Sequence, residues 1–236
     1  MSILSTIYEN LYYTLIYENR YMYFLKGLLN TLVMAFFACI IGIVLGIILA
    51  IIIDYNEKTK KLPFLSFLSK IYIGLIRGTP SLLQLMIIYY IIFRSININI
   101  IVVGIISFGL NSAAYVSQII RSGIISVSSG QEEAAKMLGL NYVQTMRYII
   151  MPQAMRNIMP ALGNEFITLL KETSVAGYIG IAELTKASDI IASRTYDYFF
   201  PLFIVAIIYL ILTVGLSKIL NIIERKLAND WNKRLI

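Results

Sequence analysis

The amino-acid sequence predicts an all-α integral membrane protein with five transmembrane helices, and three observations lead to this fold class. First, 58% of the 236 residues are hydrophobic and only 14% are charged, whereas soluble domains contain about 45–50% apolar and about 25% charged residues. Second, the apolar residues gather in long segments that can cross a bilayer as helices. Third, Lys and Arg concentrate in the loops that would lie on one side of the membrane.

The predicted organisation has three parts, with the N-terminus outside the membrane and the C-terminus in the cytoplasm. An N-terminal interfacial segment is followed by a transmembrane domain and then by a basic cytoplasmic tail. The ranges are 1–23 for the N-terminal segment, 24–224 for the domain and 225–236 for the tail, with spans at about 24–53, 64–93, 100–120, 158–179 and 201–223.

The N-terminal segment is rich in tyrosine, and its tyrosines alternate with charged residues such as Glu9, Glu18 and Arg20. Tyrosine rings are enriched at the level of the lipid headgroups. We therefore expect this segment to lie at the membrane interface, and the alternative is a binding platform for a partner protein.

The first span contains thirty residues, which as a helix reach about 45 Å and can cross the bilayer with tilt. Gly42 and Gly46 are four residues apart and allow another helix to approach closely, so we expect packing within the subunit on this face. The loop that follows contains Lys58, Lys60 and Lys61 and is therefore expected in the cytoplasm.

The second span is interrupted by Arg77, Gly78, Thr79 and Pro80. Glycine and proline inside a span release backbone groups that neighbouring helices or water must satisfy. The interruption indicates either a kink near the interface or a broken helix that borders a substrate pathway. Arg77 is expected to face protein or water, because a charge that faces lipid is costly.

The third span carries polar residues at three- and four-residue spacing, namely Asn111, Ser112, Tyr115 and Gln118. This spacing places them on one face of a helix. Polar faces inside membranes either bind other helices or line a cavity, and both interpretations stay open for this stripe.

The fourth span contains three charges, each costing about 2.5–3.5 kcal/mol on insertion scales. Glu165 and Glu172 are seven residues apart and share a helix face with Thr168, while Lys171 points elsewhere. An acidic face buried in a helix bundle suits a ligand ammonium or guanidinium group. The alternative is an internal ion pair with Arg77 or Lys171.

The remaining segments complete the topology. Residues 180–200 form a polar loop that is expected outside, facing any delivery protein, and the fifth span leads into the basic tail. In this topology fourteen of the 20 Lys and Arg residues lie on the cytoplasmic side, five lie outside and Lys171 lies in the membrane. This asymmetry agrees with the positive-inside rule.

The loop between the third and fourth spans, residues 121–156, is the longest polar stretch of the chain. Ser129 followed by Glu132 fits a capping box and predicts a helix that starts near Ser129. Gly139 is suited to the left-handed conformation that ends a helix. A second short helix is expected over 143–150, with Pro152 at its end. Two short helices exposed to the cytoplasm suit docking into a groove of another protein.

This loop resembles the EAA loop of ABC-importer permeases. The matching pattern is Glu133-Ala134-Ala135, three residues, Gly139, nine residues, and Ile149-x-Met151-Pro152, with Met151 where the family usually has Leu. Further matches are Arg77-Gly78-Thr79-Pro80, Ala113-Ala114-Tyr115 with Arg121, Asn164-Glu165-Phe166, and Leu170-Lys171-Glu172-Thr173-Ser174. Together they are similar to the polar amino-acid branch, the histidine, glutamine and arginine permeases, over roughly 25–224. Two positions depart from the family pattern. Gln118 stands where members often have an acidic residue, and Glu172 stands where they usually have Asp.

The resemblance implies a type I ABC importer permease fold in the plasma (inner) membrane of a prokaryote, with lipid around it and no role for nucleic acid. It implies three partners: an ABC ATPase dimer, an extracellular or periplasmic amino-acid-binding protein, and a second permease copy, either identical or a close paralogue. The coupling residues would be Glu133, Ala134, Ala135, Gly139 and Pro152. The chain has no G-x-x-x-x-G-K-[ST] loop, so ATP and Mg²⁺ would bind the separate ATPase and this chain would hold no cofactor and no metal.

For the substrate, the resemblance favours a basic amino acid, arginine, lysine or histidine, with glutamine, glutamate or cystine as alternatives. Glu165 and Glu172 would accept its amino or guanidinium group, and Arg77 with the backbone of 78–80 would bind its carboxylate. The other candidate binding residues are Asn111, Tyr115 and Thr168.

Two further classes of protein were weighed. A proton-coupled secondary transporter would use the same buried carboxylates, but it usually shows two repeated halves, which this sequence lacks. A membrane-embedded enzyme is disfavoured because the chain has no histidine and one cysteine, Cys39, in an apolar run. Only carboxylates and hydroxyls would then be left for acid–base work, so no catalytic residue is expected.

Overall fold

The computed structural model describes the backbone of residues 3–233 and the side chains of residues 5–226, and every regular element in this part of the chain is helical. The α-helices are α1 (Ile3–Leu11), α2 (Tyr21–Thr59), α3 (Pro63–Arg77), α4 (Ser81–Ile87), α5 (Ile100–Ile125), α6 (Ser129–Met137), α7 (Tyr142–Thr145), α8 (Met151–Glu172), α9 (Leu184–Thr195) and α10 (Phe199–Lys233). Short π- and 3₁₀-helices are η1 (Tyr12–Ile16), η2 (Tyr17–Asn19), η3 (Ile88–Ile92), η4 (Met146–Ile150) and η5 (Thr173–Ile179).

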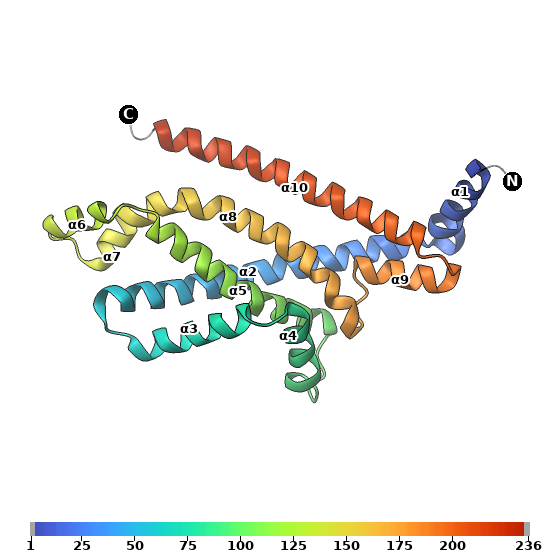
Figure 1. Ribbon diagram of the computed structural model, residues 1–236, viewed down its shortest axis with the longest axis horizontal. Helices are drawn as coiled ribbons and strands as arrows, with labels where there is room; N and C mark the ends of the chain where they lie inside the picture. Colours follow the sequence, from blue (N-terminus) through green and yellow to red (C-terminus); the bar gives the residue numbers. More distant parts are fainter. Residues whose placement is uncertain (1–2, 234–236) are drawn as a thin grey trace.

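The helices form an elongated bundle (Figure 1). The short helices α6 and α7 lie at one end of the bundle, together with the C-terminal part of α10, and α1 and α9 lie at the other end. Among the described residues, α2, α5 and α10 are each long and apolar enough to cross a membrane, and α3 with α4–η3 adds a fourth candidate that is bent by 109°. Helix α8 does not meet the same criterion, so the count of five spans stays a prediction.

Helices α2 and α5 form the most extensive pair in the bundle. Small residues allow their backbones to approach closely: a β-carbon added to Gly42 would lie 2.8 Å from the Ser112 side chain, and one added to Gly46 would lie 2.6 Å from Val116 Cγ1. The predicted close approach at these two glycines is therefore confirmed, and it occurs within the subunit.

The break in the second predicted span separates α3 from α4. Gly78 follows the last residue of α3, and Pro80 precedes α4 in an extended conformation. The side chain of Gln84 holds the break together, because its Nε2 donates to the carbonyl oxygens of Ile76 at 2.7 Å and Thr79 at 3.0 Å. These bonds satisfy backbone groups that the interruption leaves without helical partners.

The segment expected to be a polar loop, residues 180–200, contains helix α9, so that expectation was wrong. Glu183 caps α9 from a fully buried position, accepting from the backbone N–H groups of Thr185 and Lys186, each at 2.6 Å. Helix α2 supports the cap, since Asn30 Nδ2 donates to the Ala182 carbonyl at 2.8 Å. Glu183, which the sequence places in an exposed polar loop, is thus a buried N-cap of a helix.

We predict that Gly27→Ala destabilises the protein by about 1–3 kcal/mol, because overpacking at a rigid contact forces the backbone to shift. A β-carbon at Gly27 in α2 would lie 2.8 Å from the Glu183 carbonyl oxygen, and it would therefore push α9 off α2. The matched control is Gly74→Ala in α3, where no atom lies within 4 Å of the added carbon. Thermal denaturation of both purified variants in detergent tests this, and equal melting temperatures would contradict it.

Candidate functional site

Helix α6 begins at Ser129, which confirms the predicted start. Its N-cap is Ser128, whose side chain makes no capping hydrogen bond, so the predicted capping box of Ser129 and Glu132 was wrong. The Glu132 carboxylate instead contacts two lysines, Lys58 Nζ at 2.9 Å and Lys136 Nζ at 3.1 Å. The hydrogen bond from Lys58 is the main reason that the pKa of Glu132 is lower than usual.

The end of α6 is a left-handed turn at Gly139, as predicted. Its φ is +76°, a conformation that glycine adopts without strain. The Leu140 N–H donates to the Ala135 carbonyl at 3.1 Å and the Gly139 N–H to the Lys136 carbonyl at 3.0 Å, the two bonds of a Schellman motif. The turn fixes the direction in which the chain leaves α6.

The second helix of the loop is present over the predicted residues 143–150, as α7 and η4, but its predicted end at Pro152 was wrong. Helix α7 is followed without interruption by η4 and α8, and Pro152 lies in the first turn of α8 rather than ending a helix. Pro152 therefore lies inside one continuous helical segment, where the preceding Met151 N–H donates to the Met146 carbonyl, and the fixed φ of proline is close to that of a helix. A capping box does occur in this loop, between Asn141 and Gln144 at the start of α7.

The predicted coupling residues divide between the surface and the interior. Glu133 and Ala134 are exposed, while Ala135 is fully buried beneath α6. Sequence reasoning missed two apolar side chains just before the glycine turn: Met137 is 90% exposed and Leu138 is 77% exposed. Exposed apolar groups at the tip of a loop suit an interface with a partner protein, and their position directly before Gly139 was the available signal in the sequence.

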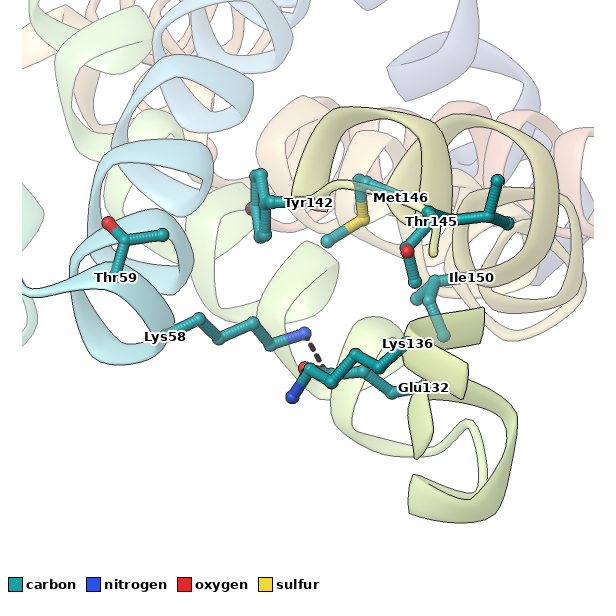
Figure 2. A pocket seen from close by; sticks show the side chains of 9 residues that line it. Lys58, Thr59, Glu132, Lys136, Tyr142, Thr145, Met146 and Ile150 are labelled. Atoms are coloured by element: carbon teal, nitrogen blue, oxygen red, sulfur yellow. Dashed lines mark ion pairs between the residues drawn. The ribbon is translucent and has the colours of Figure 1, made fainter. Parts of the chain in front are cut away.

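Helices α6, α7 and η4, residues 129–150, are held against the end of α2 (Figure 2); we call them the coupling loop, after the role that the resemblance implies. The Tyr142 hydroxyl donates to Asp54 Oδ2 at 2.7 Å, and the Tyr142 ring packs edge-on against Tyr55 with 5.1 Å between the ring centroids. Figure 2 shows Lys58 extending from α2 toward Glu132 of α6 across a small cavity of about 140 Å³.

A second cavity, of about 490 Å³, lies where the end of α3 meets α5 and α8. Its polar lining consists of Arg77, Tyr115, Gln118, Ser122, Ser126, Asn157 and Glu165. The structure thus brings three of the predicted substrate residues together, one from each of α3, α5 and α8. Gln118, Ser122, Ser126 and Asn157 were not predicted as binding residues, although Gln118 belongs to the polar stripe of the third span.

The two charged groups of this cavity have separate partners. The Arg77 guanidinium lies over the Tyr115 ring, 5.7 Å from its centroid, and Glu165 Oε1 accepts from Ser112 Oγ at 3.0 Å. Among the ion pairs of the described residues, none joins Glu165 or Glu172 to Arg77 or Lys171. The alternative of an internal ion pair is therefore not seen, and a positive and a negative group remain available in one cavity.

The other predicted substrate residues lie outside the lining of this cavity. Glu172 is the last residue of α8, Thr168 is exposed on the same helix, and residues 78–80 are exposed at the break. Asn111 is buried, and its Nδ2 donates to Gln84 Oε1 at 2.9 Å. Gln84, which sequence reasoning missed, thus links the broken helix to α5; a glutamine inside an apolar span was its signal.

A bundle of membrane-spanning helices with a broken span, a polar cavity and a loop that presents apolar groups at one end defines a membrane transport subunit. Residues 42–229 match the family described as "Binding-protein-dependent transport system inner membrane component", and the chain belongs to this family.

Relatives agree with this family. The chain is 42% identical over 219 residues to the "Putative glutamine transport system permease protein GlnP" of Rickettsia prowazekii (strain Madrid E), covering 92% of this chain and 98% of the relative. It is 38% identical over 210 residues to the "Arginine transport system permease protein ArtQ" of Bacillus subtilis (strain 168), covering 88% and 94%. Among solved structures, an "amino acid ABC transporter with histidines" has a TM-score of 0.80 at 40% identity, covering 96% of this chain and 99% of that one. The MetNI methionine ABC transporter shares the fold, with a TM-score of 0.75 at 18% identity, covering 87% and 96%.

The chain is therefore a multi-pass membrane protein and a permease subunit of an amino-acid ABC importer. Permeases of this family are transport components that work with an ATPase and a substrate-binding protein. This assignment replaces the hypothesis of a proton-coupled secondary transporter, which the carboxylates of the fourth span had also suggested.

We predict that Gly139→Val leaves the subunit inserted in the membrane and separates ATP hydrolysis from uptake. Valine at a positive φ costs about 1–2 kcal/mol, so the Schellman turn opens and the tip of the loop changes direction. Uptake and ATP hydrolysis by vesicles that contain the subunit and its ATPase, supplied with a substrate-binding protein, measure the effect. Gly130→Ala within α6 is the control, since only Ser128 Oγ, at 3.6 Å, is near the added carbon. Normal uptake by Gly139→Val would refute the role of the turn.

Proposed function

We propose that this permease imports a basic amino acid, with arginine, lysine and histidine as the expected substrates. One observation carries the proposal: Arg77 and Glu165 line the same cavity, and each is bound by a neutral neighbour rather than by an opposite charge. A free basic amino acid carries an α-carboxylate, an α-ammonium group and a basic side chain, which is cationic in arginine and lysine and in protonated histidine. Arg77 would bind the carboxylate, and Glu165 would bind the ammonium or guanidinium group.

The energetic advantage of this arrangement comes from the low dielectric of the bundle. Two opposite charges attract several times more strongly near a protein surface or interior than in water, and hydrogen bonds to charged groups contribute about 1.5–3 kcal/mol each. Tyr115 contributes an aromatic face and Gln118 an amide to the same cavity. Glu172 and Thr168, on α8, would contact the substrate outside the cavity as it moves, as would the exposed backbone of residues 78–80. Asn111 would support the site through Gln84.

The proposed topology has five spans with the N-terminus outside and the C-terminus in the cytoplasm, in the plasma (inner) membrane of a prokaryote. Helix α8 would be the fourth span, since charged groups in a span are tolerated where they face a cavity. The position of α1 at the opposite end of the bundle from α6 and α7 supports this orientation (Figure 1).

The proposed energy source is an ABC ATPase dimer that binds ATP and Mg²⁺ and docks at the coupling loop. Glu133, Ala134, Met137 and Leu138 offer it exposed contacts, while Ala135, Gly139 and Pro152 keep the loop in shape. A second permease copy, identical or a close paralogue, would cover the exposed break at residues 78–80. A binding protein outside the membrane would deliver the substrate.

A glutamine importer is the second candidate. It is favoured by the name of the relative that is 42% identical and by the amide of Gln118 in the cavity. Glutamine offers Glu165 only its α-ammonium group, whereas arginine and lysine also offer a side-chain cation, so the substrate preference of a Glu165 variant separates the two candidates. The competition experiment described next also tests glutamate and cystine as substrates.

We predict that Glu165→Gln weakens the uptake of arginine roughly 10- to 100-fold, because it removes a hydrogen bond between charged groups. The measurement is uptake of labelled arginine by vesicles that contain the subunit with its second permease copy and its ATPase, supplied with the binding protein, with unlabelled lysine, histidine, glutamine, glutamate and cystine as competitors. Glu9→Gln, in the exposed surface of α1, serves as the matched control. If glutamine competes best and Glu165→Gln transports it normally, the glutamine proposal replaces the basic one.

A further inference from the structure

The cytoplasmic end of α2 contacts both the coupling loop and the helices that line the substrate cavity. Asp54, Glu57 and Lys58 lie on neighbouring turns there, and none of them belongs to the loop or to the cavity. Asp54 and Lys58 contact the coupling loop, whereas Glu57 contacts α3 and α5. The end of α2 therefore joins two parts of the subunit that the proposed transport cycle must link.

The contacts toward the coupling loop include a nearly buried charge. The Asp54 side chain is 9% exposed, and it accepts the hydroxyl of Tyr142 at 2.7 Å. Lys58 Nζ lies 3.7 Å from Asp54 Oδ2 and 2.9 Å from Glu132 Oε2, so it bridges the two carboxylates. Hydrogen bonds to ionised groups are short and strong, and an unpaired charge here would be costly.

The contacts toward the cavity pass through Glu57. Its carboxylate accepts from Arg121 Nη2 at 2.8 and 3.0 Å and from Lys70 Nζ at 3.0 Å. Arg121 lies on α5, less than a turn beyond Gln118, which lines the cavity. Lys70 lies on α3, seven residues before Arg77 at the helix end. Both pairs are partly exposed and individually weak, but each joins α2 to a cavity wall.

Chain continuity alone connects the coupling loop to α5 and α8, which border it in the sequence. It does not connect the loop to α3, which carries Arg77. We propose that Asp54, Lys58, Glu132 and Tyr142 form a coupling latch that makes α2 follow the loop, and that Glu57 passes this movement to α3. The side of the cavity that carries Arg77, on α3, and the side that carries Glu165, on α8, then move together. The inference rests on the proposed function, because it needs the loop to be the ATPase docking site.

Removal of a single hydroxyl group tests the latch. Tyr142→Phe keeps the ring against Tyr55 but leaves Asp54 without its donor. The control is Tyr148→Phe, an exposed tyrosine of the same loop. We expect Tyr142→Phe to lower amino-acid uptake per ATP hydrolysed roughly tenfold, the scale of one hydrogen bond to a charged group. Binding of the ATPase to the immobilised subunit should stay unchanged, and Tyr148→Phe should match the wild type.

A double-mutant cycle separates the latch from general damage to the fold. Asp54→Ala and Tyr142→Phe each remove one partner of the same hydrogen bond, so their combination should lose no more coupling than the worse single variant. Additive losses in the double variant would mean that the two residues act independently, and this would overturn the latch.

Two other results contradict the inference in distinguishable ways. If Tyr142→Phe hydrolyses ATP and transports with the wild-type ratio, or if its loss of uptake only follows a loss of ATPase binding, the latch is wrong and the proposed function stands. If the wild-type subunit, assembled with its second permease copy, its ATPase and its binding protein, takes up none of the amino acids tested, the proposed function itself fails, and the latch fails with it.

Discussion

The close packing of α2 against α5 is the contact on which the rest of the subunit depends. Gly42 and Gly46 let α5 lie directly on α2. Because α5 is held on this side, its polar residues Tyr115 and Gln118 can line the cavity that it shares with α3 and α8. The same pairing leaves the end of α2 free to contact the coupling loop. One stripe of small residues thus positions both the cavity and the element that we propose moves it.

The break between α3 and α4 is the second constraint, and it is stabilised from outside the broken helix. Gln84 binds two released carbonyl groups and also accepts the amide of Asn111 on α5. A backbone interruption at membrane depth is tolerated only where neighbours satisfy its polar groups. This network therefore fixes Arg77 at the edge of the cavity, at the point where α3 ends.

The parts of this structure that follow from local rules could be predicted from the sequence. The start of α6 and the left-handed Gly139 depend on a few neighbouring residues, and so does the helix break at Pro80. The spacing of Gly42 and Gly46 predicts a close approach, but not that Ser112 of α5 is the residue that approaches. Features that depend on distant partners could not be predicted. The carboxylate of Glu132 pairs with a lysine 74 positions earlier rather than with its own helix end, and the fold decides which polar residues of a stripe meet in one cavity.

The buried cap of α9 has a consequence for how the chain enters the membrane. Glu183 is fully buried, and the N–H of the next residue donates to Thr31 of α2, which is buried as well. Helix α9 has twelve residues, too few to cross a bilayer. It can therefore settle only against a helix that is already in place, and that helix is made first, because α2 precedes α9 in the chain. Synthesis therefore provides the supporting helix, α2, before α9, the helix that packs on it.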